Sequence, residues 1–269
     1  MDEIVLLALG LTLFAGLATG IGSALAFFTS RTNTKFLAWS LGFSAGVMIY
    51  VSMVEIFVKA KGALVEEHGE SAGYWWTVIG FFSGMVIIAL IDRFIPSVGN
   101  PHNVKTVEEF HTEPTHDEYV RLKKMGIFTA IAIAIHNFPE GIATFASTIQ
   151  DPNLGIAIAV AVAIHNIPEG IAVAVPLYFA TGDRKKAFKW SFLSGLSEPI
   201  GALFAWLILM PYLTDTMFGM IFAGVAGIMV FISLDELLPA AQKYDQTHLA
   251  IYGVVSGMFV MALSLLLLM

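Results

Sequence analysis

The sequence predicts an all-α integral membrane protein, an eight-transmembrane-helix bundle with both termini outside. Of its 269 residues, 57% are hydrophobic and only 13% are charged, whereas soluble domains average about 45–50% apolar and about 25% charged residues. Apolar runs of about 20 residues, enough to cross the ~30 Å hydrocarbon core of a bilayer, recur along the chain. We therefore expect one multi-pass domain over residues 1–269 in the cell membrane.

Eight spans account for these apolar runs. They cover residues 4–28, 36–57, 74–91, 125–148, 154–177, 188–209, 217–238 and 248–269. Because their number is even, both termini lie on one side of the membrane. The acidic start of the chain, followed by about 25 apolar residues, lacks the basic n-region and short h-region of a cleaved signal peptide, so we expect the first run to be a span.

The basic residues predict the orientation, because Lys and Arg are retained on the cytoplasmic side. All of the 14 basic residues except Lys59 and Lys61 lie in or beside the odd-numbered loops, which are therefore cytoplasmic. The longest of these loops, residues 96–124, contains His102, His111 and His116 in a polar, acidic segment. We interpret it as a flexible loop rather than as a metal-collecting site.

Four glycine pairs have the small-x3-small spacing that lets helices approach closely in lipid. They are Gly16 and Gly20, Gly42 and Gly46, Gly80 and Gly84, and Gly253 and Gly257. This spacing predicts a tightly packed helix bundle and carries no information about function.

A ten-residue motif occurs twice, near the middle of the fourth and fifth spans. Residues 134–143 read AIHNFPEGIA and residues 163–172 read AIHNIPEGIA, identical at nine of ten positions. Consecutive spans run antiparallel, so the copies should face each other across a local pseudo-two-fold axis in the membrane plane. Paired, broken helices at mid-membrane are typical of transporter binding sites, and Pro139 and Pro168 predict a break or kink in each helix.

Each copy places a histidine, an asparagine and a glutamate on one helix face, because His and Glu are four residues apart and Asn and Glu three. The residues are His136, Asn137 and Glu140 in the first copy and His165, Asn166 and Glu169 in the second. In antiparallel helices His136 lies level with Glu169, and His165 lies level with Glu140. Four residues at ~1.5 Å each separate the two levels by about 6 Å.

Glu198, near the middle of the sixth span, adds a third wall to this polar centre. Ionised groups at mid-bilayer cost at least ~2.5–3.5 kcal/mol each on insertion scales, so the acids are either protonated or neutralised by a metal cation. The chain has no cysteine, which leaves nitrogen and oxygen ligands. We hypothesise a two-metal site: a histidine-bearing position suited to zinc, and an oxygen-rich position of the two asparagines and three glutamates, suited to iron or manganese.

Three further acids lie within the spans. We expect Glu55, toward the outer end of the second span, to be an entrance-side surface group rather than a ligand. Asp235 and Glu236 lie nearer the cytoplasmic end of the seventh span, where they are either solvated or line an exit.

At the twin motifs the chain resembles the ZIP (Zrt/Irt-like) family of metal transporters, and within it the bacterial zinc-uptake members. The resemblance covers essentially the whole chain. It implies uptake of zinc into the cytoplasm, with iron, manganese or cobalt as further substrates, often by a homodimer. The zinc ligands that it implies are Glu140, His165 and Glu169, with His136 as an additional ligand. The second position that it implies consists of Asn137, Glu140, Asn166, Glu169 and Glu198.

Better-known eukaryotic members of that family read roughly His-Glu-x-Pro-His-Glu in the fifth span. This chain has Asn166 and Glu169 at the corresponding positions. It therefore exchanges ligand types there, and the sequence does not rank zinc against iron.

The sequence leaves three alternatives to metal uptake. The polar groups could hydrogen-bond helices together without a metal, a metal efflux carrier would use the same ligands, and a membrane-embedded zinc metalloenzyme would use buried His and Glu to activate water. The chain contains no HExxH, and its polar groups spread over several spans. We therefore predict a transporter and not an enzyme, without a resident cofactor, whose partners are divalent metal ions and the lipid bilayer, with no nucleic acid.

Overall fold

The computed structural model of the chain describes residues 2–26, 34–94, 116–212, 214–244 and 248–268. Within these ranges the chain is helical apart from short links, and they contain no β-strand. The predictions for His102 and His111 fall outside the described residues.

The helical elements are more numerous than the predicted spans because several spans consist of two or three consecutive pieces. In chain order they are α1 (Glu3–Ala26), α2 (Thr34–Tyr50), η1 (Val51–Ile56), α3 (Phe57–His68), α4 (Glu70–Phe94), α5 (His116–Gln150), α6 (Pro152–Thr181), α7 (Arg184–Gly195), α8 (Ser197–Phe204), η4 (Ala205–Leu209), η5 (Met210–Tyr212), α9 (Asp215–Ile232), η6 (Ser233–Leu237), α10 (Leu238–Tyr244) and α11 (Leu249–Leu268). The segments η1, η4 and η6 are π-helical and η5 is a 3-10 turn.

Seven stretches of the described residues are long and apolar enough to span a membrane. They are Glu3–Leu25, Lys35–His68, Glu70–Arg93, Pro152–Val175, Arg184–Tyr212, Asp215–Lys243 and Leu249–Leu267. Each contains most of one predicted span. The predicted fourth span lies within α5, which is not among the seven.

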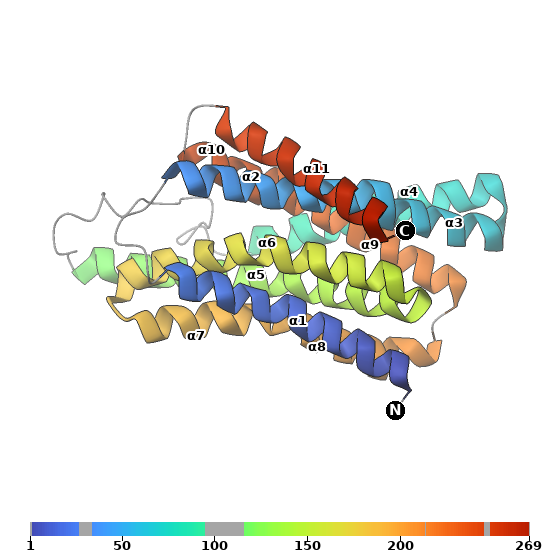
Figure 1. The fold of residues 1–269 in the computed structure, drawn as a ribbon, viewed down its shortest axis with the longest axis horizontal. Coiled ribbons are helices and arrows are strands. Elements are labelled where there is room, and N and C mark those ends of the chain that lie inside the picture. The colour runs from blue at the N-terminus through green and yellow to red at the C-terminus, as the bar shows by residue number, and fades with distance from the viewer. Residues whose placement is uncertain (1, 27–33, 95–115, 213, 245–247, 269) are drawn as a thin grey trace.

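The helices form two packed groups, one below the other in Figure 1. The lower group consists of α1, α5, α6, α7 and α8, and the upper group of α2, α3, α4, α9, α10 and α11. Helix α6 contacts α1 and α5 within its own group and α2 and α11 of the other. The two helices that carry the repeated motif therefore lie at the centre of the protein, and both chain ends lie at one end of the bundle (Figure 1).

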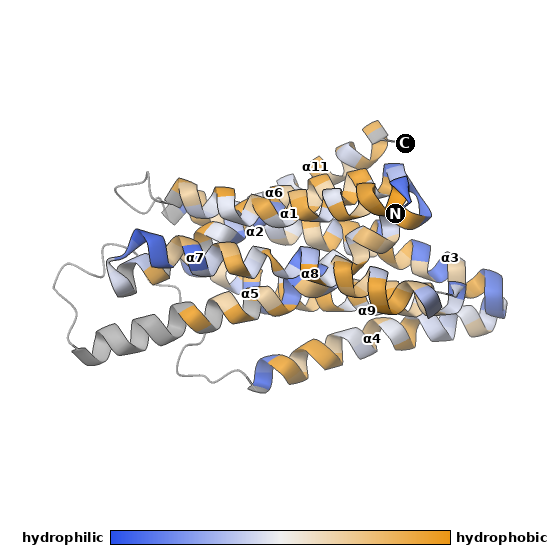
Figure 2. Ribbon diagram, turned by 90° about the horizontal axis from the view of Figure 1, so that it is seen from below, coloured by the Kyte–Doolittle hydropathy of each residue, from blue (hydrophilic) through white to orange (hydrophobic). Residues whose placement is uncertain are grey.

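The outer surface is apolar. Large hydrophobic side chains on the outer helices are more than half exposed, among them Trp75, Phe82, Phe259 and Leu266. Figure 2 shows hydrophobic residues along the helices, while hydrophilic residues gather mainly at the helix ends. Since the interior buries histidine, asparagine and glutamate instead, the polarity is that of a protein surrounded by lipid.

Glycines bring α2 and α11 into backbone contact. A Cβ atom at Gly42 would lie 2.2 Å from the carbonyl oxygen of Ala250, and one at Gly257 would lie 2.1 Å from that of Phe43, whereas real Cβ atoms essentially never approach within 3.0 Å. The close packing predicted from the small-x3-small spacing is confirmed for this pair of helices.

The second and third spans are longer than predicted. The chain is continuously helical from Thr34 to His68 and turns at Gly69, whose φ of +79° suits glycine, directly into α4. The intervening segment, which lies outside both predicted spans, is therefore a helical hairpin. Its polar residues are good helix formers, and Lys61 Nζ donates a hydrogen bond to Tyr74 Oη at 3.3 Å across the hairpin.

Helix α5 also begins earlier than predicted. It starts at His116, so residues 116–124, expected to belong to a flexible loop, are helical. Hydropathy marks where a helix enters lipid and not where it begins. Polar residues with good helix propensity can extend a span into water, and the sequence before Met125, DEYVRLKK, is of that kind.

Pro139 and Pro168 do not interrupt their helices, although each was predicted to break or kink its span. Helices α5 and α6 continue across both prolines, because the loss of one backbone hydrogen bond is tolerated where neighbouring helices pack around it. The break lies in the sixth span instead, at Leu196 between α7 and α8. Pro199 follows in the first turn of α8, where a missing N–H costs no intrahelical bond.

Candidate metal centre

The seven residues predicted from the repeated motif and the sixth span come together in one buried centre. Each is at most 2% exposed. They are His136, Asn137 and Glu140 of α5, His165, Asn166 and Glu169 of α6, and Glu198 of α8. Helix α5 packs against both α6 and α8, so the three walls face one another.

Two histidine–glutamate pairs connect α5 to α6. His136 Nε2 lies 3.2 Å from Glu169 Oε2, and His165 Nε2 lies 3.3 Å from Glu140 Oε2. This is the crosswise pairing predicted for two antiparallel copies of the motif. Within the described residues these glutamates form ion pairs with histidine and not with Lys or Arg.

The asparagines point their amide nitrogens at neighbouring helices. Asn166 Nδ2 donates to the backbone carbonyl of Ala15 in α1 at 2.9 Å and also to Glu198 Oε1. Asn137 Nδ2 donates to the carbonyl of Ser194 at 3.4 Å. Both amide groups are therefore held in orientations that leave their oxygen atoms available.

Each of the seven residues retains one buried polar atom without a hydrogen-bond partner among the described residues. These atoms are His136 Nδ1, Asn137 Oδ1, Glu140 Oε1, His165 Nδ1, Asn166 Oδ1, Glu169 Oε1 and Glu198 Oε2. An unsatisfied buried polar group costs about 1–3 kcal/mol, a cost that ordered water or a bound cation would remove. Nitrogen and carboxylate or amide oxygen atoms are the donors that zinc and harder divalent cations bind.

The nitrogen and oxygen atoms of the seven residues do not surround a single point. Among the described residues, no three His, Asp or Glu side chains are grouped closely enough to hold a metal ion. Each histidine is tied to a glutamate instead. Four of the seven residues are therefore arranged as two separate pairs.

A family model described as ZIP Zinc transporter matches residues 96–265, well over half of the chain. The chain belongs to the ZIP zinc transporter family. It is therefore a multi-pass membrane transporter whose substrate is zinc, and not an enzyme, which excludes the metalloenzyme alternative.

Full-length relatives agree with this assignment. A protein named zinc transporter ZupT from Lysinibacillus sphaericus is 73% identical over 268 residues, covering 100% of both chains. Proteins of the same name from Oceanobacillus iheyensis and Streptococcus mutans are 69% and 59% identical, covering 100% and 99% of both chains. The ZIP resemblance inferred from the twin motifs is confirmed.

Sequence reasoning about the ZIP motifs missed several groups beside the centre. The carbonyl of Ala15 orients Asn166, and an apolar residue gives no signal for that role. The hydroxyl of Ser44 in α2 approaches the carbonyl of His165 at 3.5 Å. Thr144, fully buried with an unpartnered hydroxyl, lies one turn beyond Glu140 on the same face of α5, and its i+4 spacing could have revealed it.

The three further acids of the spans differ in their relation to the centre. Asp235 in η6 is exposed, whereas the neighbouring Glu236 is half-buried and lies close enough to the centre to interact electrostatically with His136 and Glu169. Glu55 is only 8% exposed, so the prediction of a surface group is wrong. It lies in η1, which packs against α9 and α3, and its side chain lines a separate cavity.

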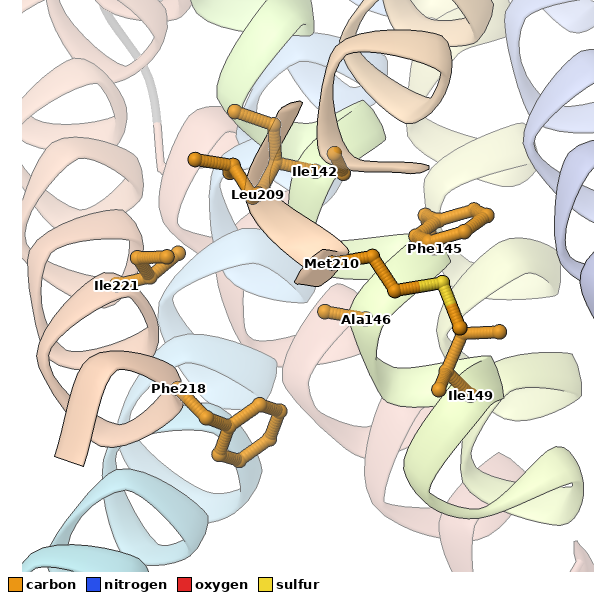
Figure 3. Close-up of a pocket in the computed structure, with 9 residues that line it drawn as sticks. Ile142, Phe145, Ala146, Ile149, Leu209, Met210, Phe218 and Ile221 are labelled. Atoms are coloured by element: carbon orange, nitrogen blue, oxygen red, sulfur yellow. The ribbon is translucent and has the colours of Figure 1, made fainter. Parts of the chain in front are cut away.

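A small cavity of about 10 Å³ between α5, η4, η5 and α9 is unsuited to the cargo of a ZIP transporter. Figure 3 shows its lining, which consists only of apolar side chains: Ile142, Phe145, Ala146, Ile149, Ala205, Leu209, Met210, Phe218 and Ile221. It offers a cation no charged, nitrogen or oxygen side-chain ligand.

Proposed function

We propose that this ZIP transporter carries zinc into the cytoplasm and binds it in transit at the buried centre formed by α5, α6 and α8. The observation that carries the proposal is the pair of crosswise His–Glu contacts, surrounded by seven unpartnered nitrogen and oxygen atoms. Such a centre is costly when empty and is stabilised by a divalent cation. The relatives named zinc transporters support zinc as the principal cargo.

The pairs supply a complete ligand set for zinc. Zinc prefers four nitrogen or oxygen ligands in a tetrahedron, and the two pairs together contain two imidazoles and two carboxylates. Where a histidine Nε2 donates its proton to the carboxylate, its unpartnered Nδ1 carries the lone pair. The coordinate bonds from these donors to a zinc ion compensate for the loss of its hydration shell.

The oxygen atoms of Asn137, Asn166 and Glu198 form the second position of the proposal. They lie on the α8 side of the centre, where Asn166 contacts Glu198. An oxygen-rich position suits harder cations than zinc. We therefore include iron(II), manganese and cobalt as further substrates, with Glu140 and Glu169 shared between the two positions.

The proposed topology has eight spans, with α5 as the fourth and both termini outside. Both ends lie at one end of the bundle, and α7 begins with Arg184, Lys185 and Lys186 at the opposite end (Figure 1). Because the chain has no cysteine, single cysteines report sidedness directly. An impermeant maleimide added to intact cells should label Gly62→Cys and not Lys185→Cys, and the reverse pattern would invert the topology.

A homodimer is part of the proposal because it follows from the family resemblance. Light scattering of the purified protein in detergent measures the mass of the protein without the detergent. We expect twice the mass of one chain, and the mass of a single chain would exclude the dimer under these conditions.

The decisive experiment is zinc uptake into proteoliposomes. Replacing Glu169 by alanine removes a ligand and leaves His136 without its partner, so we expect uptake to fall about tenfold or more. Glu67→Ala, which removes an exposed acid at the tip of α3, is the matched control and should transport normally. Unchanged zinc flux in Glu169→Ala would overturn the site, and flux only out of zinc-loaded vesicles would favour an efflux carrier.

A further inference from the structure

A second cavity, lined mainly by polar and charged side chains, lies at the end of the bundle where α5 is joined to α6 through Asp151. Its volume is about 220 Å³, and it is lined by Glu55, Lys59, Asp151, Asn153, Leu154, Ala157 and Leu265. Leu265 is close to the C-terminus, and both termini lie at this end of the bundle (Figure 1). In the proposed topology the cavity therefore faces the outside, from which zinc arrives.

Glu55 is a buried carboxylate that accepts no hydrogen bond from the described residues. It is 8% exposed, and the Lys59 ammonium lies 3.9 Å from its Oε1, beyond hydrogen-bonding distance. A buried ionised carboxylate normally needs close donors or a cation. The side chain of Lys59 is 44% exposed, so its ammonium can leave for water at little cost.

Asp151 brings a second carboxylate to the same cavity. Its Oδ1 accepts hydrogen bonds from the backbone N–H groups of Asn153 and Leu154 at 3.0 Å and 3.5 Å, which caps α6. Its Oδ2 has no such partner among the described residues. The two carboxylates together carry two negative charges when ionised, and Lys59 compensates one of them. A divalent cation would compensate both.

The cavity and the metal centre are connected by two helices of matching length. Asp151, directly after the end of α5, lies eleven residues beyond Glu140, and Glu55 lies eleven residues beyond Ser44, whose hydroxyl approaches the carbonyl of His165. Each interval corresponds to about 16 Å of helix. Both intervals therefore place the cavity at a similar distance from one pair, His165 and Glu140.

Unpartnered hydroxyls lie along this interval. Ser52 is three residues before Glu55, and Thr144 is one turn beyond Glu140. Both residues are fully buried, and neither hydroxyl oxygen has a hydrogen-bond partner among the described residues. Ser52 and Glu55 both belong to the π-helical η1, a geometry frequent at functional sites. A partly dehydrated cation would find oxygen ligands at these positions.

We propose that the cavity is an outer binding site for a divalent cation, that Lys59 occupies it as a tethered counter-cation, and that an arriving ion displaces Lys59 into water. The ligands are the carboxylates of Glu55 and Asp151, with the amide oxygen of Asn153 beside them. The proposal that a cation binds here depends only on the cavity and its side chains. The proposal that this binding is the first step of entry to the metal centre rests on the proposed function.

Uptake kinetics in proteoliposomes test the displacement. Lys59→Met removes the charge and keeps the side-chain length, so the half-saturating zinc concentration should fall up to about fivefold, the range of a partly exposed ion pair, at an unchanged maximal rate. Glu55→Gln should raise it. Lys61→Met is the matched control, because Lys61 bonds to Tyr74 and does not line the cavity. Equal half-saturation in Lys59→Met and Lys61→Met would overturn the competitor role.

Equilibrium binding separates this proposal from the transport mechanism. Radioactive zinc is titrated onto detergent-purified Glu169→Ala, in which the central site is disabled, and onto the same variant with Glu55→Gln added. We expect Glu169→Ala to bind zinc saturably and the double variant Glu169→Ala, Glu55→Gln not to bind it. If both bind zinc equally, the outer site is wrong, even where Glu169→Ala has abolished uptake. Because Lys59→Met is expected to gain affinity, misfolding cannot mimic its effect.

Discussion

The glycine that follows the glutamate in each copy of the motif lets a neighbouring helix approach the metal centre closely. A Cβ atom at Gly141 would lie 2.0 Å from the carbonyl oxygen of Glu198, and one at Gly170 would lie 2.0 Å from that of Thr19. In Gly141→Ala the first distance must grow from 2.0 Å to at least 3.0 Å. Since this contact joins two backbones, α8 itself has to move away and take Glu198 with it.

The cost of Gly141→Ala follows from two opposing effects. Overpacking costs about 1–3 kcal/mol, and a contact between backbones belongs in the upper part of that range. Alanine recovers about 1 kcal/mol of helix propensity. A net loss of about 1–2 kcal/mol corresponds to a fall in Tm of roughly 2–8 °C for a chain of this size.

Thermal unfolding in detergent, followed by tryptophan fluorescence, measures this loss. The control is Gly62→Ala in α3, where a Cβ atom meets nothing within 4 Å, and its Tm should stay equal or rise. Zinc uptake by Gly141→Ala should fall at temperatures where the protein is still folded, because Glu198 is displaced. A Tm equal to that of Gly62→Ala, with normal uptake, would refute the reasoning.

Three further predictions concern neighbouring groups. Glu198→Gln, which keeps the side-chain size but removes the charge, should reduce iron or manganese uptake more than zinc uptake; equal reduction in competition assays contradicts the oxygen-rich position. Ser197→Ala removes the hydrogen bond to the carbonyl of Ala134 that joins α8 to α5, and should cost about 1 kcal/mol, measured as Tm. Asp183 accepts hydrogen bonds from the backbone N–H groups of Lys186 and Lys185 at the start of α7, which holds the pKa of its carboxyl below the ordinary value. Its contribution to stability is therefore present above the ordinary aspartate range and is lost as the pH falls through the lowered pKa. The Tm of Asp183→Ala should accordingly fall less between neutral and acid pH than the Tm of the unchanged protein.

Much of the candidate site could be predicted because helical geometry is local. A spacing of four residues puts His136 and Glu140 on one face in any α-helix, and a short loop makes the next helix antiparallel. The crosswise contact between His136 and Glu169 follows from these two facts alone. The spacing of small residues in Gly42 and Gly257 likewise predicted close packing, because only a missing side chain lets two backbones meet in lipid.

Helix ends and breaks were predicted poorly. Hydropathy measures which residues lie in lipid, so it did not register the polar but helix-forming residues at the start of α5 or in the α3–α4 hairpin. Pro139 and Pro168 suggested breaks, yet the packing of neighbouring helices keeps α5 and α6 continuous. The break at Leu196 depends on what packs around α7 and α8, which no local pattern contains.

The sequence by itself determined that this protein crosses a membrane many times, which residues line its polar centre, and to which family it belongs. Only the tertiary structure decided how that centre is bounded. The carbonyl of Ala15 orients Asn166 from a helix more than a hundred residues away in sequence. Glu55 and Asp151 line one cavity, although no pattern in either sequence segment predicts that the two segments meet. Such contacts arise from the packing of distant helices, and packing depends on the whole set of side chains at once.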